Sequence, residues 1–157
     1  MKKSLITLIA LTLTSSAFAA TTGTLNLKGT VAQALSISVN GDASALNLDL
    51  HNPKVKDLKV ASVLEQSNSK TGYKVSISSQ NKGILAHEDG KNVDSLGYSM
   101  KYGTQTVDFS KTDVISQGKA DAYNVSKDVK VSYDGREATD MVAGEYRDTI
   151  TFSISAN

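Results

Sequence analysis

The chain contains no cysteine and no tryptophan, and a single proline, Pro53, occurs among its 157 residues. Without cysteine there are no disulfide bonds, so packing or assembly must hold the protein together. Thiolate ligands for zinc are also missing, and the only two histidines, His51 and His87, are not spaced as a metal-binding pair. We therefore expect both histidines to lie in solvated loops, and we expect no metal or other cofactor.

The chain also lacks an excess of either charge, with 17 basic and 16 acidic side chains. No basic patch is visible, which argues against nucleic acid as a partner. The many serines include no G-x-S-x-G motif. The stretch Asp89-Gly90-Lys91-Asn92 lacks the acidic spacing of a calcium loop. These absences argue against an enzyme.

The N-terminal residues have the features of an export signal. Met1-Lys2-Lys3 is basic, and the apolar run from Leu5 to Leu13 is too short to span a bilayer. Ala17-Phe18-Ala19 fits the small-x-small rule of signal peptidase. We predict that residues 1–19 are a signal peptide and that residues 20–157 form a mature chain of single-domain size.

Apolar residues in the mature chain recur with a period of two rather than 3.6. Turn signals such as Asn40-Gly41-Asp42 and Asp134-Gly135 separate the alternating sets. Short strands at this spacing, without a long helical pattern, predict an all-β fold, namely an antiparallel β-sandwich. The sets are Leu46, Leu48 and Leu50; Leu58, Val60 and Leu64; Tyr73, Val75 and Ile77; Leu96, Tyr98, Met100 and Tyr102; Val129, Val131 and Tyr133; and Ile150, Phe152 and Ile154.

The alternation that precedes these sets is unusually long. It runs from Leu25 to Val39, which at ~3.4 Å per residue would span about 50 Å. A typical strand in a globular domain measures only ~17–20 Å. Either the segment bends from one sheet to the other near Ala32-Gln33-Ala34, or its first half lies outside its own domain. The pattern alone leaves both options open.

The first half of this segment resembles the donor strand of pilins, the subunits of chaperone–usher fimbriae. Leu25, Leu27, Gly29 and Val31 alternate on one face. In the family, a glycine stands in this strand where the acceptor groove is narrow.

The C-terminal run resembles the pilin terminal strand through Gly144, Tyr146, Ile150, Phe152 and Ile154. Gly144 stands fourteenth from the C-terminus, as the corresponding glycine does in the family. The chain departs from the family in having Ala156 where an aromatic residue is common, and it lacks the disulfide of many pilins. Archaic or alternative branches without a disulfide are the nearest match.

The resemblance implies an immunoglobulin-like sandwich (residues 33–157) that lacks its final strand, preceded by a donor-strand extension (residues 20–32). A periplasmic chaperone would fill the groove along the terminal strand. At the outer-membrane usher, the donor strand of an identical or related subunit would then replace the chaperone. The product would be a surface fimbria that supports adhesion or biofilm formation, and the sequence identifies no host receptor.

Two other interpretations remain. The chain could be a self-complete secreted or periplasmic β-sandwich that binds a ligand and pairs its first strand within its own domain. A secreted hydrolase is the weakest reading, because no nucleophile or paired acid is evident.

Overall fold

A computed structural model describes residues 21–117 and 119–157. The predicted signal peptide, residues 1–19, lies outside the described residues. The chain divides into two units, of which the first ends at Val31 and the second comprises Ala32–Asn157. Residues 21–34 form no regular secondary structure, so the alternation between Leu25 and Val31 is not a strand in this structure.

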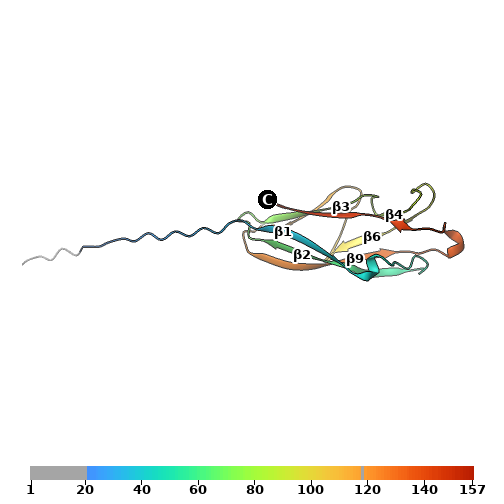
Figure 1. Ribbon diagram of the computed structural model, residues 1–157, viewed down its shortest axis with the longest axis horizontal. Helices are drawn as coiled ribbons and strands as arrows, with labels where there is room; N and C mark the ends of the chain where they lie inside the picture. The colour runs from blue at the N-terminus through green and yellow to red at the C-terminus, as the bar shows by residue number, and fades with distance from the viewer. Residues whose placement is uncertain (1–20, 118) are drawn as a thin grey trace, which may run out of the picture. The chain divides into compact units, whose positions relative to one another are not determined.

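The second unit consists of antiparallel strands, which confirms the predicted all-β class (Figure 1). The largest sheet has the order β1-β2-β9-β6-β7. Its strands are β1 (Leu35–Gly41), β2 (Val55–Ser67), β9 (Tyr123–Tyr133), β6 (Ser99–Tyr102) and β7 (Gln105–Thr106).

Two smaller sheets have the orders β11-β3-β8 and β10-β4-β5. Their strands are β11 (Ile150–Ala156), β3 (Tyr73–Ser79), β8 (Asp113–Gln117), β10 (Tyr146–Arg147), β4 (Ile84–His87) and β5 (Ser95–Gly97). Two 3-10 helices, η1 (Ala43–Ala45) and η2 (Ala138–Asp140), lie in the connections.

The core lies between the five-stranded sheet and the two smaller ones, and contacts between side chains tie the layers together. The rings of Tyr102 on β6 and Phe152 on β11 lie 5.7 Å apart, centroid to centroid. Inward residues of the central strands are almost completely buried, because period-two alternation places every second side chain on the same face. These residues include Val63, Tyr73, Val75, Ile77 and Val129.

One charged side chain belongs to this core. Glu65 on β2 has no solvent exposure, and its carboxylate accepts hydrogen bonds from the hydroxyl of Tyr73, at 2.5 Å, and from that of Tyr102. Lys127 Nζ lies 3.0 Å from Glu65 Oε1 and 5.0 Å from the centroid of the Tyr102 ring. A buried carboxylate requires such partners, because removing it from water without them is very costly.

Sequence-based expectations about secondary structure fail in several places. The predicted set Leu96, Tyr98, Met100 and Tyr102 is divided between β5 and β6, which belong to different sheets. The alternation Leu46, Leu48, Leu50 does not form a strand, because the chain after β1 closes local turns, such as Leu46 N–H to Ala43 O at 3.2 Å. Leu46 is 88% exposed, whereas Leu48 and Leu50 pack against the core. The short strands β4 and β8 were not anticipated. In β4, Ile84 and Leu85 are adjacent apolar residues and break the alternation.

Candidate functional site

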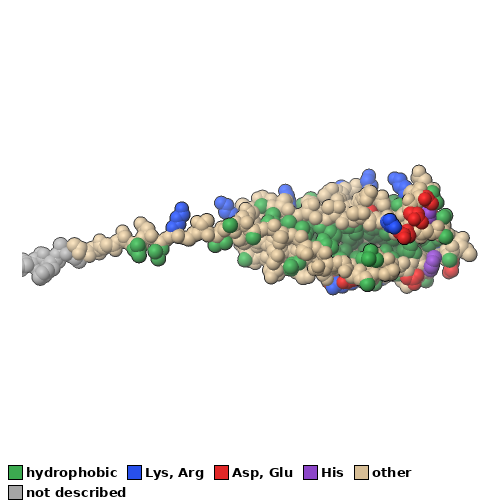
Figure 2. Space-filling model, viewed as in Figure 1, with side chains coloured by type: hydrophobic (Ala, Val, Ile, Leu, Met, Phe, Trp, Pro, Cys, Tyr) green, Lys and Arg blue, Asp and Glu red, His purple; other side chains and the backbone are tan. Residues whose placement is uncertain are grey.

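An apolar groove runs along one long side of the second unit, between the segment that follows β1 and the segment from Gly144 into β11. Three adjoining cavities make up the groove, and all three are lined by Leu48. Figure 2 shows hydrophobic side chains gathered in a hollow along this face, between rims of backbone and polar atoms. We call this feature the groove, and its walls come from segments about one hundred residues apart in sequence.

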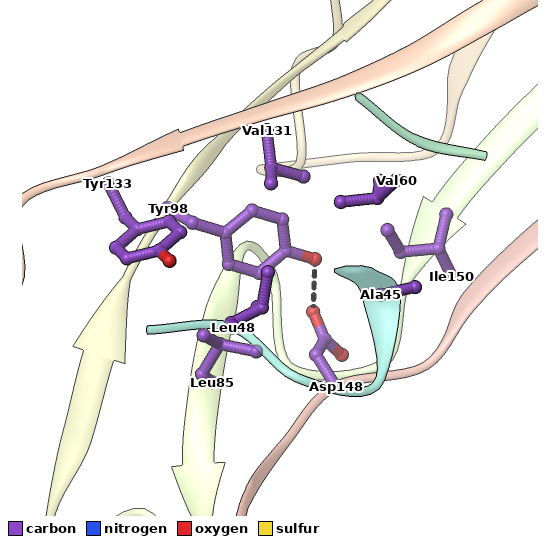
Figure 3. Close-up of a pocket in the computed structure, with 9 residues that line it drawn as sticks. All are labelled: Ala45, Leu48, Val60, Leu85, Tyr98, Val131, Tyr133, Asp148 and Ile150. Carbon is purple, nitrogen blue, oxygen red and sulfur yellow. Dashed lines mark hydrogen bonds between the residues drawn. The ribbon is translucent and has the colours of Figure 1, made fainter. Parts of the chain in front are cut away.

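The first cavity, of about 160 Å³, is the most apolar part of the groove. Figure 3 shows its lining: Ala45, Leu48, Val60, Leu85, Tyr98, Val131, Tyr133, Asp148 and Ile150. A cavity of ~150 Å³ lined by aliphatic and aromatic groups stays dry and takes up a molecule as large as benzene. This cavity therefore has the capacity for one large aliphatic side chain.

β1, which leads into the segment lining the groove, and β11, which contributes Ile150 to the first cavity, are each the edge of a sheet among the described residues. β1 pairs with β2 and β11 pairs with β3, while the opposite edge of each strand has no partner strand there. The two strands approach each other. Their inward apolar residues, Leu35 and Ile37 on β1 and Ile150, Phe152 and Ile154 on β11, are only half-buried. By contrast, the facing residues of central β3 are 0–1% exposed. The core is therefore incompletely covered along this side.

Asp148 fixes the wall of the first cavity. Its carboxylate accepts hydrogen bonds from the Tyr98 hydroxyl at 2.6 Å, the Ser79 hydroxyl at 2.5 Å and the Asn81 N–H at 2.9 Å. Burial, and then the hydrogen bond to Asp148, raise the pKa of Tyr98 well above its usual value. Tyr98 thus remains neutral and presents its ring to the cavity while its hydroxyl is satisfied (Figure 3).

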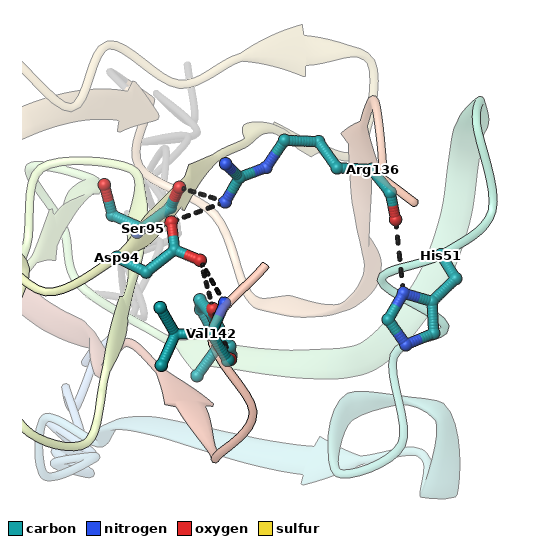
Figure 4. Close-up of polar contacts among 6 residues, drawn as sticks. His51, Asp94, Ser95, Arg136 and Val142 are labelled. Atoms are coloured by element: carbon teal, nitrogen blue, oxygen red, sulfur yellow. Dashed lines mark hydrogen bonds and ion pairs between the residues drawn. The ribbon is translucent and has the colours of Figure 1, made fainter. Parts of the chain in front are cut away.

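A second polar cluster holds the end of the groove (Figure 4). Asp94 pairs with Arg136 at 2.6 Å between Oδ1 and Nη2 and accepts the Val142 N–H at 3.0 Å. The Tyr146 hydroxyl also donates to Asp94. Hydrogen bonds from Tyr146 and Arg136 hold the pKa of Asp94 far below its usual value. A carboxylate that stays ionised therefore ties the loop before β10 to β5.

His87 supports the same end of the groove through its contact with Ala143, which lines the second cavity. His87 lies on β4 and is only 4% exposed, so the expectation that it is a solvated loop residue is wrong. His51, by contrast, is exposed, and its Nδ1 lies 3.2 Å from Arg136 O (Figure 4). His87 Nδ1 accepts the Asp89 N–H at 3.1 Å, which leaves Nε2 to donate to Ala143 O at 3.1 Å. The His87 ring also packs edge-on against Tyr146, at 5.3 Å between centroids. β4 is short and irregular in pattern, so nothing in the sequence signalled this burial.

Gly144 lies directly against this histidine. A Cβ built on Gly144 would stand 2.3 Å from His87 Nε2 and 2.8 Å from Glu88 Oε1, and the φ of Gly144 is +152°. No larger residue fits without moving His87. The close approach gives a physical reason for glycine at this position.

The structure brings together some of the residues singled out from the sequence. Gly144, Tyr146 and Ile150 line the groove, whereas Phe152 and Ile154 line none of its three cavities and pack, partly buried, against the core. Leu48, Leu85, Tyr98 and Val131 also line it, although no sequence pattern groups them, because they come from four separate segments.

The predicted donor residues lie in the first unit. Leu25, Leu27 and Val31 are 84%, 88% and 86% exposed, and a Cβ added to Gly29 would meet nothing within 4 Å. Every residue from 21 to 34 is exposed, so the three apolar side chains share the exposure of the whole segment.

No cluster of three or more His, Cys, Asp or Glu that could hold a metal ion occurs in residues 21–117 and 119–157. Within the same ranges, no helix is long and apolar enough to cross a membrane. Comparison of the chain with models of known protein families finds no match, and no curated protein matches its sequence significantly.

Proposed function

We propose that this chain is a structural subunit of a surface fimbria and that its groove accepts the N-terminal segment, residues 21–31, of a neighbouring copy. In this proposal the second unit is an immunoglobulin-like sandwich without its final strand. One observation carries the proposal: an apolar groove is lined by Ile150 of β11, a strand with one unpaired edge among the described residues, in a chain that also exposes Leu25, Leu27 and Val31.

The energetics favour strand addition at this groove. Burial of Leu25, Leu27 and Val31 contributes about 1.5–3 kcal/mol for each side chain. Each main-chain hydrogen bond to a free edge adds roughly 1 kcal/mol. In strand addition of this kind, backbone pairing supplies affinity and pockets for alternate side chains supply specificity. Here the cavity beside Ile150 has room for one leucine side chain.

The same geometry accounts for the proposed assembly and partners. A segment at one end of a subunit that fills a groove in the next makes a heterologous contact, which propagates as a filament rather than closing. Until a partner covers them, the open edges that β1 and β11 have among the described residues are an aggregation hazard. A periplasmic chaperone that covers them and an outer-membrane usher that exchanges the strand are therefore the proposed partners. Export through the periplasm to the cell surface, and a role in adhesion or biofilm formation, belong to the same proposal.

Electrophoresis of surface material in SDS, with and without boiling, tests this function. We expect a ladder of multimers that collapses to monomer only on boiling, because strand-exchanged joints resist SDS. Deletion of residues 20–31, or the substitution Leu27→Asp, should abolish the ladder. The neighbouring Asn26→Asp, which adds the same charge at an outward position, should preserve it. A ladder that survives the deletion would refute the assignment of the donor segment.

A further inference from the structure

We infer that Asn68 keeps the N-terminal segment from folding back into the groove of its own subunit and so reserves the groove for another copy. The inference rests on the proposed function, because it concerns the choice between two occupants of the same groove: the chain's own residues 21–31, or those of a neighbour. The observation behind it is a set of hydrogen bonds at the start of β1, all within the second unit.

The ladder between β1 and β2 runs from Gly41 opposite Ala61 to Leu35 opposite Ser67. The next pair in this register is Ala34 and Asn68, and the Asn68 N–H donates to Ala34 O at 3.2 Å. In a regular antiparallel ladder the Ala34 N–H would donate in return to the backbone oxygen of Asn68. Here it donates at 2.6 Å to the side-chain oxygen, Asn68 Oδ1.

The side chain of Asn68 extends the ladder by a further step. Its Nδ2 donates to Ala32 O at 2.9 Å. If the β1–β2 register continued, Ala32 would pair with residue 70, whose backbone N–H would make this bond. The backbone cannot make this bond, because the chain has already turned there, with the Gly72 N–H donating to Ser69 O at 3.2 Å. The amide of Asn68 therefore replaces a peptide group of β2 and holds Ala32–Ala34 as a continuation of β1.

This arrangement opposes closure of the groove by its own chain. β2 pairs with one edge of β1, and the groove is lined by the segment that follows the far end of β1, from Ala45 to His51. For residues 21–31 to enter that groove, the chain would have to reverse direction within residues 32–34. A reversal would separate Ala32 O and Ala34 N from Asn68. The sequence Ala32-Gln33-Ala34 also contains none of the residues that favour tight turns.

Limited trypsin digestion of refolded protein tests the inference. Lys28 is the only lysine or arginine between residues 20 and 33, so cleavage after Lys28 reports whether the segment is buried. The full mature chain, residues 20–157, is refolded at low micromolar concentration, and its species are separated by size-exclusion chromatography. A monomer resistant at Lys28 has filled its own groove; a cleavable monomer is open; a resistant multimer has exchanged strands.

We expect Asn68→Ala to raise the ratio of resistant monomer to multimer by about tenfold, the equilibrium equivalent of losing two exposed hydrogen bonds. Asn68→Asp keeps the acceptor for the Ala34 N–H and loses the donor to Ala32 O, so its shift should be intermediate. Asn124→Ala is the matched control, because this exposed asparagine on β9 bonds only the side chain of Gln66 among the described contacts, at 3.4 Å. Its ratio should equal that of the unmodified chain.

If Asn68→Ala left the ratio of resistant monomer to multimer unchanged, the inference would be wrong. If the alanine variant does not refold, the same ratio measured for Asn68→Asp decides the question. Failure of the proposed function gives a different result. The unmodified chain would then be a cleavable monomer at every concentration, and resistant monomer in Asn68→Ala would still support the role of Asn68. If that variant were also cleavable, both proposals would be wrong.

Discussion

Replacement of Lys127 by methionine should be among the most damaging single changes to this protein. Lys127 Nζ lies 3.0 Å from Glu65 Oε1, and the side chain of Glu65 has no solvent exposure. Methionine preserves much of the aliphatic stem of Lys127 but leaves the carboxylate without a positive partner. The hydroxyls of Tyr73 and Tyr102 would then be its only remaining donors among the contacts described.

The size of the effect follows from this geometry. Removal of one partner of a buried ion pair costs 3–5 kcal/mol in general. We expect about 3 kcal/mol here, because Lys127 retains 18% exposure and water can approach the cavity that its ammonium leaves. That amount is a large part of the 5–15 kcal/mol that stabilises an ordinary domain.

Equilibrium urea unfolding of dilute protein, followed by circular dichroism, measures this cost. Lys130→Met is the matched control, because Lys130 lies on the same strand and points to the opposite face; it should change the free energy of unfolding by no more than ~0.5 kcal/mol. The double variant Glu65→Gln with Lys127→Met should be less destabilised than the two single changes added together. Equal effects of Lys127→Met and Lys130→Met would refute the reasoning.

Two further predictions concern buried tyrosines and the end of the groove. Burial, followed by hydrogen bonds to Glu65, raises the pKa of Tyr73 and of Tyr102 above the usual ~10. The two buried tyrosines should therefore contribute fully to the free energy of unfolding below pH ~10, and this contribution should fall as the pH rises above ~10. A titration of tyrosinate absorbance in which both tyrosines ionised near pH 10 without unfolding would contradict this prediction. Gly144→Ala should cost about 2 kcal/mol, within the range for overpacking, because its Cβ would stand 2.3 Å from His87 Nε2. Gly97→Ala, where a Cβ meets nothing within 4 Å, is its control in urea unfolding, and equal costs would show that the contact with His87 is unimportant.

Sequence pattern predicted the framework of the fold better than the connections. Alternating residues located β2, β3, β9 and β11, because a strand with one buried face must place an apolar side chain at every second position. The same rule misassigned the segment Leu46–Leu50, where alternation coincides with local turns and a half-buried edge. It also failed for His87, whose burial depends on packing against Tyr146 and Ala143, more than fifty residues away.

The sequence by itself determined the all-β class and picked out Leu25, Leu27 and Val31 as an alternating apolar face, because both depend on side-chain order along a single segment. Only the tertiary structure decided that the segment after β1 and the start of β11 line an apolar groove, that Asp94 and His87 hold its end, and that the amide of Asn68 prolongs the edge of β2. These features arise where segments distant in the chain meet, and local periodicity carries no information about which distant segments will become neighbours.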